Sequence, residues 1–80
     1  MAIDRKYGKV RTDIVDAFAD DEPVFIIRAK DSSSISALLA YAEKAYNQGA
    51  SATFIDDVMS SVKRFSKWQD EHRDEIKTPD

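Results

Sequence analysis

The stretch DEPVFIIRAKDSSS, from Asp21 to Ser34, decides how the chain is organised, because it joins a strand signal to a helix start. Pro23 holds the residue before it in extended geometry. The run Val24–Ala29 that follows is β-branched and aromatic and is too short for a helix. Apolar residues fall on both faces of this run, so we expect both faces to be covered. Its pairing partner is then either the Tyr7–Thr12 region or the same strand of another subunit.

A first helix is predicted directly after this strand, over Ser33–Gln48. Asp31 and Ser32–Ser34 are residue types that cap helix N-termini. Gly49 follows at a position typical of the glycine that ends a helix. Apolar residues between these signals repeat at intervals of three and four and form one stripe, made of Ile35, Leu38, Leu39, Ala42 and Tyr46.

A second helix is predicted over Thr53–Arg73. Thr53 and Asp56 have the spacing of a capping box, with Asp in the place usually taken by Glu. The short connection Asn47–Ala52 makes the two helices an antiparallel hairpin. The apolar stripe of the second helix consists of Ile55, Val58, Met59, Val62, Phe65 and Gln69, with Phe54 and Trp68 beside it.

The segment before the acidic turn supports two interpretations. Val10, Ile14, Val15 and Phe18 have helical spacing, with Thr12 as an N-cap. The run from Lys9 to Thr12 could equally be a strand that leaves the Gly8 turn.

Together these patterns predict a single α+β domain over residues 1–80 that is dominated by helix. We expect a short two-stranded sheet, formed within the chain or completed between subunits, packed on the helical hairpin. Residues 1–6 and 77–80 are expected to be frayed ends.

Composition narrows the function classes. The 80 residues are 42% hydrophobic and 34% charged, as in a soluble globular domain, with a net charge of -3 that gives no strong nucleic-acid signal. The chain has no cysteine and a single histidine, so we expect no metal and no cofactor. A chain this short usually needs an additional source of stability, such as disulfides, a metal or a partner subunit. Since we expect neither disulfides nor a metal, we expect a homo-oligomer. No apolar run has the length of a membrane span.

Catalysis is not expected. The sole imidazole, His72, lies between Glu71 and Arg73 on a charged helix end, where a general base would be solvated. The serines of Ser32–Ser34 lie where helix caps belong. With only Gly8 and Gly49, the chain has no glycine-rich phosphate loop.

A binding site is the better-supported hypothesis. Arg28 follows core residues of the strand, and it either pairs with Asp31 or offers its planar guanidinium to a phosphate or carboxylate. The helix start beside it would add backbone N–H groups and the positive end of the helix dipole. An aromatic side chain would stack on a base. The predicted ligand-binding residues are Arg28, Lys30, Ser32, Ser33, Tyr41 and Trp68.

The run from Glu22 to Asp31, with Trp68-Gln69 on the last helix, resembles small uncharacterised proteins of bacteriophages and actinobacteria. These proteins carry an E-P-V-F-x-L-R-A-x-D core and a W-Q near the end of the last helix, and the similarity covers about residues 7–80. Leu commonly stands there in place of Ile27, and Gln in place of Lys30.

The resemblance implies a phage or prophage origin and a role in the host cytoplasm. We therefore expect a non-enzymatic anti-defence protein that binds an anionic ligand and sequesters a host nucleotide immune signal. The alternatives are an inhibitor that binds and blocks a host protein, or a small structural or assembly protein with no ligand. A membrane partner is not expected.

Overall fold

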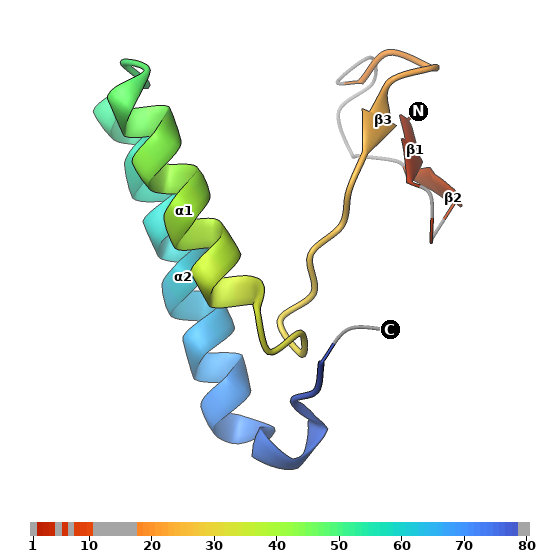
Figure 1. Cartoon of the computed structure of the whole chain (residues 1–80), viewed down its shortest axis with the longest axis vertical. Helices are drawn as coiled ribbons and strands as arrows, with labels where there is room; N and C mark the ends of the chain where they lie inside the picture. The colour runs from red at the N-terminus through yellow and green to blue at the C-terminus, as the bar shows by residue number, and fades with distance from the viewer. Residues whose placement is uncertain (1, 5, 7, 11–17, 79–80) are drawn as a thin grey trace.

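The computed structural model describes residues 2–4, 6, 8–10 and 18–78, and these form a helix-dominated α+β chain (Figure 1). Two long helices pack side by side, and three short strands lie apart from them, joined by an extended segment. The predicted fold class is therefore confirmed at the level of helix dominance and of two helices packed together.

The strands are β1 (Ala2–Asp4), β2 (Gly8–Val10) and β3 (Pro23–Val24). They pair in the order β2-β1-β3, with β1 antiparallel to β2 and parallel to β3. The central strand thus comes from the first residues of the chain, which the sequence had led us to expect as a frayed end.

The strand predicted over Val24–Ala29 is wrong in its extent. In the register of the parallel pair, Ile3 lies opposite Pro23 and Asp4 opposite Val24. Strand β3 ends at Val24, so the described ladder stops there. Residues 25–28 consequently cross as an extended segment toward the helices, and the strands do not cover the helical pair as predicted.

Helix α1 (Ser34–Asn47) ends in a Schellman motif. Gly49 has a φ of +89°, and its N–H donates to the carbonyl of Tyr46 at 3.0 Å. The N–H of Ala50 donates to the carbonyl of Ala45 at 2.9 Å. This is the left-handed ending that glycine favours, and it confirms the predicted role of Gly49.

Helix α2 (Ala52–Glu71) begins after Ser51, whose hydroxyl accepts the N–H of Phe54 at 3.1 Å. The predicted capping box of Thr53 and Asp56 is therefore wrong, because both residues already lie inside the helix. The N-cap is Ser51, the residue directly before the helix, and its extended backbone, with a ψ of 154°, leads the chain into the helix. A short 3₁₀ helix, η1 (Arg73–Glu75), follows α2.

The helical pair meets along a line of small residues. Ser34, Ala42 and Ala45 of α1 are buried, as is Val58 of α2. Small side chains on α1 let the helix axes approach each other closely. The predicted stripe is borne out for Ala42, which is buried, and for Ile35 and Leu38, which are half-buried. It is wrong for Leu39 and Tyr46, which lie about 100° round the helix from this line and are exposed.

The C-terminal segment returns to the start of α1. The N–H of Lys77 donates to the carbonyl of Lys30 at 3.0 Å, and the N–H of Ser32 donates to the carbonyl of Lys77 at 2.8 Å. Lys77 is thus paired and not frayed. The alternative predictions for residues 11–17 lie outside the described residues, whereas residues 8–10 form a strand.

Candidate functional site: the junction between β3 and α1

The junction between β3 and α1 holds four of the six predicted site residues. The chain leaves β3, crosses as the extended segment 25–28, turns at residues 29–33 and enters α1. Two hydrogen-bonded turns shape the entry: the N–H of Asp31 donates to the carbonyl of Arg28 at 3.1 Å, and that of Ser34 donates to the carbonyl of Asp31 at 3.1 Å.

Two backbone donors directly before α1, the N–H groups of Ser32 and Ser33, are already occupied. The N–H of Ser32 bonds the carbonyl of Lys77 at 2.8 Å. The N–H of Ser33 bonds the Asp31 carboxylate at 2.7 Å, and the Ser33 hydroxyl bonds the same oxygen at 2.6 Å. A helix start attracts anions through free N–H groups, and here the chain supplies its own carboxylate. The Ser32 and Ser33 backbone groups are therefore not presented to an external phosphate.

The Asp31 carboxylate is stabilised in its charged form. Hydrogen bonds from the Ser33 hydroxyl and then from the Ser33 N–H lower its pKa below the ordinary aspartate value of 3.8, with a smaller contribution from the charge of Lys6. Donors that bond a carboxylate favour its ionised state. Asp31 is consequently ionised at neutral pH, and its carboxylate is directed to Ser33 and not to Arg28.

Gln69 of α2 holds the junction against the helical pair. Its Nε2 lies 2.9 Å from the carbonyl oxygen of Ala29, 3.4 Å from that of Asp31 and 3.3 Å from the hydroxyl of Ser34. Ser34 is fully buried. One amide thus satisfies acceptors on both sides of the turn, which fixes where the chain enters α1.

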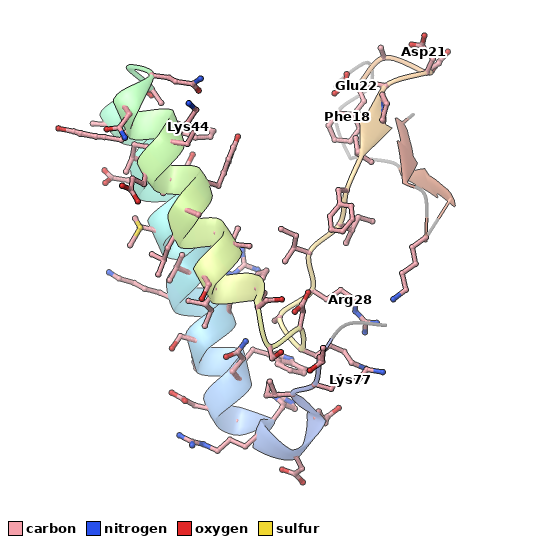
Figure 2. All side chains as sticks on the ribbon, in the orientation of Figure 1. Phe18, Asp21, Glu22, Arg28, Lys44 and Lys77 are labelled. Carbon is pink, nitrogen blue, oxygen red and sulfur yellow. The ribbon has the colours of Figure 1, made fainter. Side chains whose placement is uncertain are left out.

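Arg28 is exposed and makes no ion pair with any residue that the structure describes, so the predicted pair with Asp31 is not formed. Figure 2 shows Arg28 and Lys77 on the same side of the junction, with Lys44 far away at the other end of the helical pair. Lys30 is half-buried, and its carbonyl bonds Lys77. Arg28, Lys30 and Lys77 therefore lie at or beside the turn, and the N–H groups of Asp31, Ser32 and Ser33 are bonded within the chain.

The two predicted aromatic residues are not brought together. Trp68 is half-buried and stacks on His72, with ring centroids 4.0 Å apart and an interplanar angle of 13°. His72 Nδ1 also lies 2.8 Å from the Trp68 carbonyl oxygen. One face of the indole is therefore covered by the chain itself.

Tyr41 contacts Phe54 edge to face, with ring centroids 5.9 Å apart. Phe54 and Trp68 lie at opposite ends of α2, separated by an axial rise of about 21 Å. Tyr41 therefore belongs to the distal part of the helical pair, away from Trp68, and the two rings do not form one stacking site.

The sequence reading missed two residues of the junction. Gln69 was placed in the apolar stripe of α2, although a polar amide on such a stripe indicates a specific buried partner. Phe25 was placed in a buried strand, but it is 83% exposed. No sequence signal distinguishes it from its apolar neighbours, since its exposure results from the early end of the strand ladder.

No group of three or more metal-ligating side chains occurs among the described residues. None of the helices in the described part of the chain combines the length and the apolar character that crossing a bilayer requires. Comparison with known proteins gives no match to a family model, to a curated protein or to a solved structure.

Proposed function

We propose that this chain is a non-enzymatic protein-binding module that blocks a host protein by contact through the segment Phe25–Arg28. The observation that carries the proposal is the exposure of Phe25, at 83%, in the extended connection between β3 and the helices. An exposed phenylalanine gains free energy when a partner covers it. Arg28, three residues further on, is also exposed.

The residue types of this segment suit a protein interface. Aromatic and arginine side chains are enriched at protein interfaces and carry a large share of the binding energy there. Phe25 can fill an apolar pocket, while Arg28 can form a two-pronged bond to a carboxylate on the same partner. Ile26, which is partly exposed, extends the apolar contact.

The segment is held at both ends, which lowers the entropic cost of binding. Val24 at one end pairs with Asp4 in the parallel ladder. At the other end, the Ala29 carbonyl accepts from Gln69, and the Arg28 carbonyl accepts from Asp31. A connection that is tied down on both sides loses less freedom when a partner binds than a free loop does.

Sequestration of an anionic nucleotide is the second candidate. It is favoured by the three basic residues around the turn, Arg28, Lys30 and Lys77. It is disfavoured by the helix start, where Asp31 and Lys77 occupy the N–H groups of Ser33 and Ser32. A phosphate held there could not use these two N–H groups and would lie close to the Asp31 carboxylate.

The proposed setting is the cytoplasm of a phage-infected bacterium. This part of the proposal rests on the resemblance of the Glu22–Asp31 run and of Trp68-Gln69 to the phage and actinobacterial proteins. An inhibitor of a host defence protein acts by stoichiometric contact and requires no catalytic group.

The test is site-specific photo-crosslinking in a bacterial host. A photo-reactive phenylalanine analogue at position 25 should give a covalent adduct with one host protein, and the same analogue at the distal Lys44 position should not. The captured protein is then purified and titrated with the wild-type chain and with Phe25→Ala.

We expect Phe25→Ala to weaken this binding at least about tenfold, as for a central interface residue. Tyr41→Ala, which removes an exposed aromatic ring at the distal end, should leave it unchanged. Equal binding by the two variants, with helix content intact by circular dichroism, would contradict the proposal. Adducts of the chain with itself alone would instead favour an assembly protein with no target.

A further inference from the structure

One face of the helical pair carries large apolar side chains that the chain itself does not cover. Leu39 is 44% exposed, Tyr46 63% and Met59 37%. Leu39 and Tyr46 belong to α1 and Met59 to α2. These three residues are called the Leu39 face below.

Helical spacing places the three residues on one side of the pair. Leu39 and Tyr46 are seven positions apart, close to two full turns of an α-helix. The edge contact between Tyr41 and Phe54 marks the opposite side of the seam between the helices. Met59 lies on the flank of α2 away from Phe54, so it adjoins Leu39 across the seam.

The interior of the helical pair is too small to hold the fold alone. Among the described residues, the buried apolar side chains are those of Ala42, Ala45 and Val58. Alanine contributes little apolar area, and a pair of helices with no further layer packed on it buries too little surface to be stable alone. With no cysteine in the chain, disulfides cannot add stability.

The exposed surface area of the chain is also larger than that of a compact monomer. The chain exposes 6511 Å², whereas a folded monomer of its mass exposes about 4,850 Å². Its radius of gyration is 14.1 Å, against about 11.6 Å expected for a compact domain of this length. The strands and the extended segment, which lie apart from the helical pair (Figure 1), contribute to this excess, and so do the exposed apolar side chains of the helices.

We propose that the Leu39 face is covered by the same face of a second copy of this chain. Two helical pairs stacked through this face form a four-helix arrangement with an apolar interior, which neither copy possesses alone. A twofold axis makes one patch serve both partners. A second copy is the fitting occupant because the cover must be present whenever the chain is folded, before it meets any target.

The dimer and the proposed target contact use different surfaces. Phe25 and Arg28 belong to the extended segment before α1, which Figure 1 shows apart from the helical pair. A dimer therefore presents two such segments. The inference is independent of the proposed function, since failure of one leaves the other standing.

Solution mass is the primary test. Light scattering should give twice the 9.0 kDa chain mass for the wild-type protein at micromolar concentration. The melting temperature should rise with protein concentration, as it does when unfolding and dissociation are coupled. Leu39→Lys should lower both, because it places a charge in the apolar interface. Ala40→Lys, on the outward side of α1, is the matched control and should lower neither.

A milder set of variants tests the geometry even if Leu39→Lys fails to fold. The chain has no cysteine, so Leu39→Cys and Met59→Cys each introduce a single thiol. A short bis-maleimide should link each of these variants into covalent dimers, and it should leave Ala40→Cys as single chains. A wild-type monomer with a concentration-independent melting temperature would overturn the proposal. So would a dimer that links through Ala40→Cys and not through the Leu39 face.

Discussion

The side-chain amide of Gln69 donates a hydrogen bond of 2.9 Å to the backbone carbonyl of Ala29, 40 positions earlier in the chain. This bond joins the end of α2 to the turn that precedes α1. Gln69 also bonds the Asp31 carbonyl and the Ser34 hydroxyl, so one side chain of α2 holds the turn that follows the segment with Phe25 and Arg28.

Gln69→Ala should therefore destabilise the protein by about 1–3 kcal/mol, since it leaves partly buried acceptors at Ala29 and Ser34 without a donor. Urea denaturation followed by circular dichroism measures the change. Gln48→Ala, at an exposed position after α1, is the matched control and should change the unfolding free energy by no more than about 0.5 kcal/mol. Equal effects of the two substitutions would show that the amide does not hold the junction.

The pKa of Asp31 should lie below 3.8 in the folded protein, because Ser33 donates two hydrogen bonds to its carboxylate. A depressed folded pKa contributes stability that is complete above the unfolded value and is lost as the pH falls through the folded value. Carboxyl chemical shifts followed by NMR during an acid titration measure it. Ser33→Ala should raise the pKa of Asp31, whereas Ser32→Ala should not. A wild-type value at or above 3.8 would contradict the assignment of the cap.

Gly49→Ala should destabilise the chain by about 1–2 kcal/mol through backbone strain alone. The residue has a φ of +89°, and an added Cβ would meet no atom within 4 Å. Gly49→Asn should cost less, because asparagine tolerates left-handed geometry better than alanine does. Thermal unfolding measures the stability of both variants. An alanine variant as stable as the wild type would show that α1 does not end in a left-handed residue at position 49.

Val58→Ala should cost about 2 kcal/mol, because Val58 is the buried side chain of α2 that packs against the alanines of α1. Ser60→Ala, on the exposed side of the same helix, is the control. Denaturant midpoints of the two variants give the comparison. Should Val58→Ala be neutral, the line of contact between the helices would be misplaced.

The helices were predictable because their signals are local. The stripes of apolar residues and the ending at Gly49 lie within a few residues of the elements that they define. The sequence did not predict correctly which side of α1 faces α2. A stripe that contains both Leu39 and Ala42 does not reveal that the small residues, rather than the large ones, form the contact with α2.

The extent of the strands and the availability of the site depend on contacts between residues that are far apart in the sequence. The spacing of apolar residues does not reveal such contacts. Val24–Ala29 has the composition of a strand, but in the described ladder only Val24 of this run is paired, with Asp4. In the same way, Ser32 and Ser33 have the composition of an anion-binding helix start. Whether their N–H groups are available depends on Lys77, which lies at the far end of the chain.

The central claim is that the junction presents Phe25 and Arg28 to a protein and does not bind a nucleotide at the start of α1. The most direct measurement is thermal unfolding of the wild-type chain against a panel of cyclic and linear nucleotides. The account predicts no stabilisation by any of them. Stabilisation of about 2.7 kcal/mol at a hundredfold excess over the dissociation constant, abolished by Arg28→Ala and retained by Phe25→Ala, would contradict it.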